Sequence, residues 1–383
     1  MPLYMVRFKI FGIPTNTLDL MMSLSIVIWA FFGNKKHFSK ILVENKFVFL
    51  AISTLILGVI TALFGENYSL TGLGILKSWF ILPIGFSFVL INELNSRKDV
   101  PLIILSIFLS TLLVSFFAIV YKFLGIVTFD NRLSAFYESP NYLAMFIAPG
   151  ILCGTYLTRI SQKKIASVFL AGLLLETVVL FLTTSYATWL GIFFALLIYK
   201  LIFPNKQKWG LNFIFIIILG FLILFSQLNS EKMLSLLTNN PRSSLSSRIM
   251  IWKSAVMMIE KKPIFGIGPG KFQSTYLSFQ QYFPPYLEWA VPQPHNIFLA
   301  FWLESSIMGL ASFIAILFLS IIISFKHKKT ECLFSAFLLS FFVYTIFSGL
   351  FDTPYWKNDL SLIFWIFVML TTINLSKEGA CLK

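Results

Sequence analysis

Charged residues are scarce in this chain, and acidic residues are the scarcest of them. Only 12% of the 383 residues are charged, with 16 Asp and Glu against 30 Lys and Arg. In contrast, 57% of the residues are hydrophobic and 44 are phenylalanine. A water-soluble domain of this length could not bury so much apolar surface, which excludes soluble enzymes and soluble binding proteins. The solvent for most of this chain is therefore a lipid bilayer.

Cysteine and histidine are also rare, with three of each. Cys153, Cys332 and Cys381 are scattered in or beside apolar segments, which predicts neither a disulfide framework nor a metal site. The net charge of +14 comes from short lysine clusters between apolar runs, not from a basic face. This pattern indicates membrane topology and no nucleic-acid partner. The sequence also lacks a cleavable signal peptide, so we expect the first membrane helix to direct insertion.

Apolar runs of membrane-spanning length recur along the whole chain. A transmembrane helix needs about 20 predominantly apolar residues. We therefore expect an all-α, polytopic integral membrane protein with about eleven transmembrane helices. We expect these helices to form a single transmembrane domain over residues 1–383. The runs cover residues 17–33, 47–64, 72–92, 101–121, 141–158, 165–182, 186–202, 210–226, 296–325, 332–351 and 359–375.

The loops between these runs assign an orientation. Lysines and arginines fall in alternate loops, and the short loops between them hold acids. The positive-inside rule makes the basic side cytoplasmic, which predicts a multi-pass protein of the inner (cytoplasmic) membrane. The N-terminus is then outside, and its start directly before an inward-going helix suggests a missing preceding helix. The acids expected outside are Glu66, Asp130, Glu138 and Asp352.

One loop, residues 227–294, is far longer than the others and is expected outside. Within it, residues 246–259 are predicted to form an amphipathic helix along the membrane surface, with Ser246 as its N-cap. Gly266-Ile267-Gly268-Pro269-Gly270 follows, without the strand and spacing of a nucleotide-binding motif, and predicts a tight turn. The apolar face of the helix is expected to consist of Ile249, Trp252, Val256 and Ile259.

His295 is the single histidine on the predicted outer side. It lies in Pro294-His295-Asn296, where the long polar loop enters an apolar helix. A residue that exchanges protons near neutral pH at this boundary is a candidate general base. The alternative is a histidine that merely caps or anchors an interfacial helix.

Four charged residues lie within or near the ends of apolar runs. A charge at the centre of a bilayer costs roughly 3 kcal/mol, so such groups usually face the bundle interior and find partners. Glu304 lies nine residues after His295, and Glu176 is expected to be a protonated or paired contact between helices. Lys77 and Lys122 are expected to extend to the membrane interface.

Several motifs on the predicted outer side occur in a specific order. They include Arg248-x3-Trp252, the glycine turn after Pro263, and His295-Asn296-x2-Leu299-x4-Glu304-x4-Gly309. Arg132-Leu133-Ser134, Ser139-Pro140-Asn141 and Asp352-x-Pro354-Tyr355-x2-Asn358-Asp359 add to them. Together these motifs, which span residues 130 to about 365, resemble the O-antigen ligase and polymerase superfamily.

The resemblance implies a membrane glycosyltransferase. Such enzymes move a glycan from an undecaprenyl-diphosphate carrier to an acceptor hydroxyl at the extracytoplasmic face, and the acceptor is a lipid or another glycan. Partners would therefore be this donor, the acceptor and membrane lipids.

The chemistry of that reaction suits the residues present. Arg248 and Arg132 can meet the charge of a diphosphate with bidentate, always-protonated donors. Neutral His295 can take the proton of the acceptor hydroxyl. No external cluster of His, Asp and Glu has ligand spacing, so no metal or other cofactor is expected. His295 and Arg248 are thus the predicted catalytic residues; the predicted substrate-binding residues are Arg132, Asn141, Asn296, Glu304, Tyr186 and Trp252.

One position departs from the resemblance. Many ligases carry a Ser-Arg pair where this chain has Ser185-Tyr186, and Tyr186 provides no cation. Arg132 or another external cation, such as Arg242, would then supply the second phosphate contact, or the activity would differ. Ligase and polymerase therefore both remain open, and a transporter or flippase of lipid-linked glycans, or a non-catalytic scaffold, is the alternative from another class.

Overall fold

The computed structural model describes residues 3–33, 35, 38–65, 68–94, 99–202, 244–281, 291–327 and 332–373. Helices coincide with the predicted apolar runs wherever the chain is described, and the predicted run 210–226 lies outside these residues. The helices are α1 (Thr17–Phe32), α2 (Phe38–Glu44), α3 (Lys46–Gly65), α6 (Val100–Phe123), α7 (Pro140–Ile160), α8 (Lys163–Leu182), α9 (Tyr186–Ile202), α12 (Ser244–Lys261), α13 (Phe272–Gln280), α14 (Ile297–His327), α15 (Cys332–Gly349) and α16 (Asn358–Thr371).

A further continuous helical run, Leu70–Asn92, consists of α4 (Leu70–Ile75), a π-helical segment η2 (Leu76–Ile81) and α5 (Leu82–Asn92). Within the described ranges, six helices are long and apolar enough to cross a membrane, and four shorter apolar helices accompany them. The protein is therefore a polytopic membrane protein. The six long helices are Lys46–Gly65, Leu70–Asn92, Val100–Phe123, Pro140–Ile160, Lys163–Leu182 and Ile297–Lys326.

The expectation of an all-α chain is wrong at the N-terminus. After a short 3-10 helix, η1 (Leu3–Met5), strands β1 (Arg7–Ile10) and β2 (Ile13–Asn16) form an antiparallel hairpin. Phe11 and Gly12 form its two-residue turn, and both have positive φ, at 50° and 79°. Turns of this kind match the twist of paired strands and so favour a hairpin.

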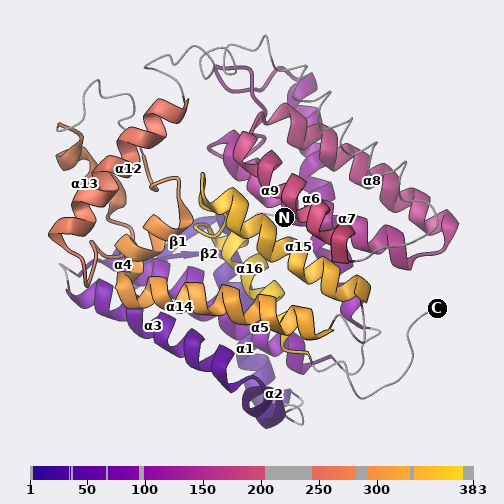
Figure 1. Cartoon of the computed structure of the whole chain (residues 1–383), viewed down its shortest axis with the longest axis horizontal. Helices are drawn as coiled ribbons and strands as arrows, with labels where there is room; N and C mark the ends of the chain where they lie inside the picture. Colours follow the sequence, from indigo (N-terminus) through magenta and orange to yellow (C-terminus); the bar gives the residue numbers. More distant parts are fainter. Residues whose placement is uncertain are drawn as a thin grey trace.

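Close backbone contact joins α3 and α14. α3 packs along α14, and the two helices run side by side in Figure 1. A Cβ built on Gly58 of α3 would lie 2.6 Å from the backbone nitrogen of Gly309 in α14, so neither helix has room for a side chain there. Small residues permit this approach, which is how membrane helices gain packing contacts. On the other side, α15 packs against α9, and α7 packs against α6 and α8.

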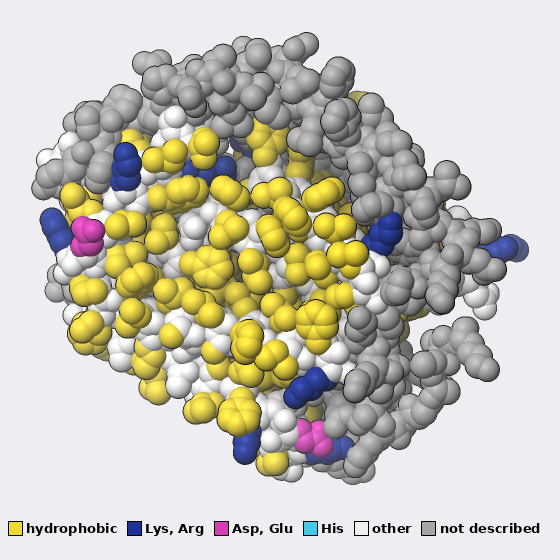
Figure 2. Space-filling model, viewed as in Figure 1, with side chains coloured by type: hydrophobic (Ala, Val, Ile, Leu, Met, Phe, Trp, Pro, Cys, Tyr) yellow, Lys and Arg dark blue, Asp and Glu magenta, His cyan; other side chains and the backbone are white. Residues whose placement is uncertain are grey.

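Apolar side chains cover the outer surface of the helices. Figure 2 shows a broad face dominated by hydrophobic side chains, with charged side chains near its edges. On α3, Leu50 and Leu57 are 60% and 51% exposed, and on α14 Phe318 is 62% exposed. Such a surface requires lipid as its solvent, because large contiguous apolar patches are rare on soluble monomers.

Two of the four unusual charges have partners inside the bundle. Thr111 of α6 donates to Glu176 Oε1 of α8 at 2.6 Å, as expected for a contact between helices. Lys77 does not behave as expected: its Nζ lies 3.1 Å from Asp19 Oδ2 and donates to the Pro14 carbonyl at 2.8 Å. Instead of extending toward lipid headgroups, Lys77 ties the hairpin to the bundle.

α12 and α13 stand together at one edge of the assembly, beside the start of α14 (Figure 1). α12 begins at Ser244, two residues before the predicted N-cap. Only part of the expected apolar face packs on the protein, because Ile249 and Val256 are exposed. The face that packs on the protein instead contains Met250, Ile251, Ala255, Met258 and Ile259, with Ile267, Phe272, Tyr276, Val291 and Leu303 of neighbouring segments.

Candidate functional site

Asp352 joins two of the predicted site residues. It is buried in the segment between α15 and α16. His295 Nδ1 lies 3.2 Å from Asp352 Oδ1, and Arg248 Nη2 lies 3.6 Å from Asp352 Oδ2. His295 lies two residues before the first residue of α14, and Arg248 lies in the first turns of α12. Three segments that are distant in the sequence therefore meet at one carboxylate.

The environment of Asp352 keeps its carboxylate ionised. Burial raises the pKa of Asp352, but the charge and hydrogen bond of His295, the guanidinium of Arg248 and the Thr353 amide outweigh burial, so the pKa lies below its ordinary value. The Thr353 amide donates to Oδ1 at 3.0 Å. In the tautomer with a proton on Nδ1, His295 would donate to Asp352 Oδ1 and keep a lone pair on Nε2.

The backbone of His295 is held in an uncommon conformation. Its φ of 48° lies in the left-handed region, which residues other than glycine seldom occupy. The indole Nε1 of Trp252 donates to the Pro294 carbonyl at 3.0 Å and contacts the His295 carbonyl at 3.4 Å. Trp252, one turn after Arg248 on α12, thus helps to fix the loop that presents the imidazole. Strained residues held in this way cluster at functional sites.

Asn296 caps α14. Its Oδ1 accepts hydrogen bonds at 3.0 Å from the amides of Phe298 and Leu299. Its Nδ2 donates at 3.1 Å to the carbonyl of Leu350, two residues before Asp352. The capping role therefore belongs to Asn296, and the His295 ring, whose side chain is 31% exposed, remains accessible beside it.

Arg132 and Asn141 form a second polar contact. Arg132 Nη2 donates to Asn141 Oδ1 at 2.7 Å, and Arg132 Nε donates to the Thr183 carbonyl at 2.8 Å. Asp130 lies 3.6 Å from the same guanidinium. Burial lowers the pKa of Arg132, Asp130 opposes this effect, and Arg248 lowers the pKa further. The guanidinium still remains charged at neutral pH, since arginine starts from a pKa above about 12.

The two arginines therefore share one electrostatic environment. Arg248 lowers the pKa of Arg132 and Asp352 raises it, which links the two contacts. Both guanidiniums are largely buried, with side chains 16% and 17% exposed for Arg132 and Arg248. Positive charge held in a partly dehydrated site attracts an anion more strongly than the same charge in water.

Tyr186 is close in sequence to the contact of Arg132 with Thr183. It is the first residue of α9 and lies three positions after Thr183, whose carbonyl accepts a hydrogen bond from Arg132. The Tyr186 ring packs edge-on against Trp189, with ring centroids 5.3 Å apart. Arg132, from the loop before α7, thus binds the carbonyl of a residue three positions before Tyr186.

Glu304 makes a tertiary contact within the protein. It is fully buried, and its Oε2 accepts a hydrogen bond at 2.9 Å from the amide of Gly270. Gly266, Gly268 and Gly270 all have positive φ, which confirms the predicted turn. Within the described residues, Glu304 therefore ties this turn to α14.

The turn fits tightly against α14. A Cβ on Gly266 would lie 2.3 Å from the Leu303 carbonyl oxygen, which itself accepts hydrogen bonds from the amides of Ile267 and Gly268 at 2.7 and 3.1 Å. α14 is interrupted at Ser306, which has φ 69° and ψ 171°. The turn and the break together set the position of the first part of α14, which begins beside His295.

The segment that contains most of this site is similar to a known protein family. Residues 169–314 match the family model described as O-antigen ligase. This part of the chain is therefore similar to O-antigen ligases. No curated protein matches the chain. The family match supports a membrane function in glycan transfer of the ligase or polymerase type.

The O-antigen ligase segment contributes some of the site residues and not others. Arg248, Trp252 and His295 lie inside residues 169–314, whereas Arg132 and Asp352 lie outside this range. Asp352 was expected on the outer side and belongs to a motif of the resemblance, but the sequence predicted no role for it. Its position in that motif was the available signal.

Proposed function

We propose that this protein is a membrane glycosyltransferase that moves a glycan from an undecaprenyl-diphosphate carrier to an acceptor hydroxyl at the extracytoplasmic face. The observation that carries the proposal is the contact of both His295 and Arg248 with Asp352. A base candidate and a diphosphate-binding candidate are held by one buried carboxylate. The match of residues 169–314 to the O-antigen ligase family supports this class of reaction.

His295 is the proposed general base. Asp352 orients the ring by accepting from Nδ1–H, so that Nε2 can take the proton of the acceptor hydroxyl. The acceptor oxygen forms a bond to the anomeric carbon as the bond from that carbon to the diphosphate oxygen breaks. The electron pair of the broken bond leaves with the undecaprenyl diphosphate. Asp352 is a positioning residue, because it acts through His295.

Arg248 and Arg132 are proposed to bind the diphosphate. The charge of the leaving group increases as the glycosidic bond breaks, so cations placed beside it stabilise the transition state. Arg248 keeps guanidinium N–H groups beyond its contact with Asp352, since a guanidinium has five. Arg132 is held by Asn141 and Thr183, and this support orients its charge. Asn141, Asn296, Tyr186 and Trp252 would shape the substrate site around these groups.

Two acceptors are compatible with this chemistry. A lipid-linked core sugar would make the protein a ligase, and a second carrier-linked glycan would make it a polymerase. Tyr186, at the position where many ligases carry arginine, leaves the choice open. Both reactions use the same donor and the same proposed base.

A reconstitution experiment tests the proposal. The purified protein in nanodiscs would be incubated with an undecaprenyl-diphosphate-linked oligosaccharide and either a lipid acceptor or a second carrier-linked oligosaccharide. We expect a covalently extended acceptor and free undecaprenyl diphosphate in equal amounts. Movement of intact donor across a vesicle membrane without any new glycosidic bond would identify a transporter instead.

A further inference from the structure

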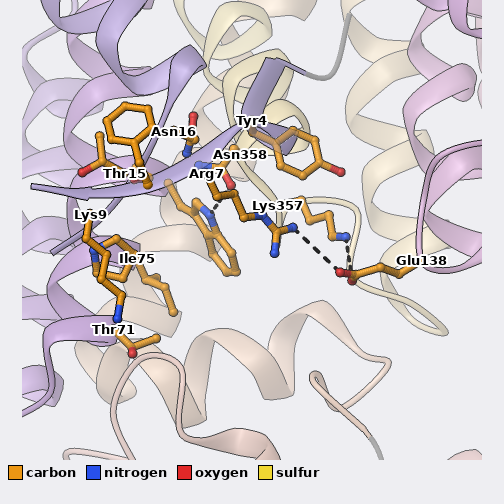
Figure 3. Close-up of a pocket in the computed structure, with 15 residues that line it drawn as sticks. Tyr4, Arg7, Lys9, Thr15, Asn16, Thr71, Ile75, Glu138, Lys357 and Asn358 are labelled. Atoms are coloured by element: carbon orange, nitrogen blue, oxygen red, sulfur yellow. Dashed lines mark hydrogen bonds and ion pairs between the residues drawn. The ribbon is translucent and has the colours of Figure 1, made fainter. Parts of the chain in front are cut away.

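A cavity of about 490 Å³ with several charged side chains in its lining opens between the N-terminal hairpin and the helical bundle. Figure 3 shows it bounded by side chains from the hairpin, from the Leu70–Asn92 run and from the loops before α7 and α16. It is separate from the contact of His295 and Arg248 with Asp352, because none of these three residues lines it. The residues used below are Arg7, Lys9, Trp79, Glu138, Lys357 and Asn358.

The lining of this cavity is positively charged. Arg7, Lys9 and Lys357 contribute three cations and Glu138 contributes one carboxylate, which leaves two positive charges. Arg7 Nη2 lies 3.8 Å from Glu138 Oε1, and Lys357 Nζ lies 3.3 Å from Glu138 Oε2. Figure 3 shows both cations directed at Glu138, so that one carboxylate is shared between them. The excess of positive charge therefore favours an anionic ligand in this cavity.

Lys9 supplies charge on the side of the cavity opposite Glu138 (Figure 3). Lys9 and Arg7 are separated by one residue in β1, so their side chains leave the same face of the strand. Lys9 is exposed and forms no ion pair with a described residue. An ammonium group at a cavity wall without a protein carboxylate beside it is suited to a ligand carboxylate or phosphate.

The uncharged lining suits a sugar. The indole Nε1 of Trp79 donates to Asn358 Oδ1 at 3.1 Å, and the Trp79 ring packs against Trp356 with centroids 5.6 Å apart. These contacts fix an aromatic surface of the kind against which the apolar face of a sugar ring packs. Thr71 lies at the exposed edge of the cavity and offers a hydroxyl group. A neutral lipid chain carries no charge that the three cations could bind.

The cavity and the proposed active site are built from the same two loops. Glu138 in the cavity is three residues from Asn141, which holds Arg132. Lys357 in the cavity is five residues from Asp352, which holds His295 and Arg248. A chain bound in the cavity therefore lies next to the loops that carry the proposed catalytic residues, on the side of the hairpin.

We propose that this cavity binds the acceptor as an anionic sugar chain that carries carboxylates or phosphates. The proposal rests on the proposed function, because an acceptor is defined by the transfer reaction. The donor sugar stays joined to its diphosphate, which Arg248 and Arg132 would bind. The acceptor chain must reach His295 from another direction, and the cavity supplies a cationic, aromatic surface for it.

The binding test uses the full-length protein in nanodiscs of zwitterionic lipid, with hexagalacturonate as an acidic probe and maltohexaose as a neutral probe. We expect Lys9→Glu to weaken hexagalacturonate binding by about tenfold or more, because a repulsive charge replaces an attractive one. Lys9→Gln should cause a smaller loss, and added salt should weaken binding by the wild type. Lys122→Glu is the matched control, because Lys122 is exposed near the end of α6 and does not line the cavity.

Hexagalacturonate binding that is equal in wild type and Lys9→Glu would overturn the inference, and so would preferential binding of maltohexaose. Inorganic pyrophosphate serves as a competitor. Displacement of hexagalacturonate at equal concentration would support a phosphate-bearing acceptor, and no displacement would support a carboxylate-bearing one.

A kinetic measurement separates this inference from the proposed function. In the transfer reaction, Lys9→Glu should raise KM for an acidic acceptor and leave KM for the donor unchanged. If the wild type transfers glycan and Lys9→Glu has a normal acceptor KM, the cavity inference fails alone. If the wild type transfers no glycan but binds hexagalacturonate in a Lys9-dependent way, the proposed function fails and the anion-binding cavity stands.

Discussion

His295 Nδ1 lies 3.2 Å from Asp352 Oδ1, although the two residues are 57 positions apart in the sequence. The carboxylate is buried and also lies against Arg248, so it fixes the imidazole and balances the guanidinium at once. Replacing Asp352 therefore tests the arrangement of the whole site.

Asp352→Asn should lower turnover by roughly 10²-fold or more, because the amide cannot hold the ring in the tautomer that leaves Nε2 free. Binding of the donor should weaken much less, since Arg248 and Arg132 remain. Turnover and donor affinity of the purified variant would be measured side by side. A variant with wild-type turnover would show that Asp352 does not orient the base.

The ionisation of Asp352 gives this prediction a pH dependence. Because the pKa of Asp352 is lowered in the folded protein, its carboxylate contributes stability that is present above the unfolded pKa and is lost as the pH falls through the lower folded value. The thermal stability of the wild type should therefore exceed that of Asp352→Asn at neutral pH, and the difference should disappear only below about pH 4. A difference that is already lost at neutral pH would show that the carboxylate is not ionised there.

Arg248 should be sensitive to the shape of its side chain as well as to its charge. Arg248→Lys keeps one positive charge but loses the planar fork, so we expect a loss of turnover of about tenfold or more, and a larger loss for Arg248→Ala. Lys253→Ala is the matched control, because Lys253 is an exposed cation on the same helix and should leave turnover unchanged. Near-wild-type turnover in Arg248→Ala would remove Arg248 from the site.

The orientation in the membrane can be tested with single cysteines in a variant whose native cysteines are replaced by alanine. Glu260→Cys on α12 and Lys163→Cys at the start of α8 are both exposed positions. The positive-inside rule predicts that Glu260→Cys reacts with an impermeant thiol reagent in intact spheroplasts, and that Lys163→Cys reacts only after permeabilisation. The reverse pattern would place the proposed site on the cytoplasmic side.

The glycine turn should tolerate no side chain at Gly266. Gly266→Ala would add strain at φ 69° and place a Cβ 2.3 Å from the Leu303 carbonyl oxygen, so we expect a lower yield of folded protein and a lower melting temperature. Gly125→Ala is the matched control, because Gly125 has φ 72° but open space around it. That variant should lose only about 1–2 kcal/mol from the backbone conformation. Equal stability of the two variants would show that contact with α14 is unimportant.

The helices could be predicted from the sequence because each depends on a local run of apolar residues. The site could be predicted in part, because His295, Arg248 and Arg132 lie in recognisable motifs on one predicted side. The role of Asp352 could not, because it depends on how the segment after α15 approaches the starts of α12 and α14. No local pattern encodes that approach.

Two other differences have similar causes. The hairpin was missed because its strands are only four residues long and its signal is the positive φ of Phe11 and Gly12. The contact between the Gly270 amide and Glu304 could not be predicted either, because it joins two separate segments, and substrate binding by Glu304 stays a prediction. Both features depend on a contact between segments or on a backbone conformation, and side-chain periodicity predicts neither.

The most direct test of the central claim is the rate of glycan transfer in a single turnover by His295→Ala, with wild type and His295→Gln measured beside it. We expect donor binding to be nearly normal and transfer to fall by about 10²–10⁴-fold in His295→Ala. Transfer by His295→Gln at a rate close to that of the wild type would contradict the assignment of His295 as the base.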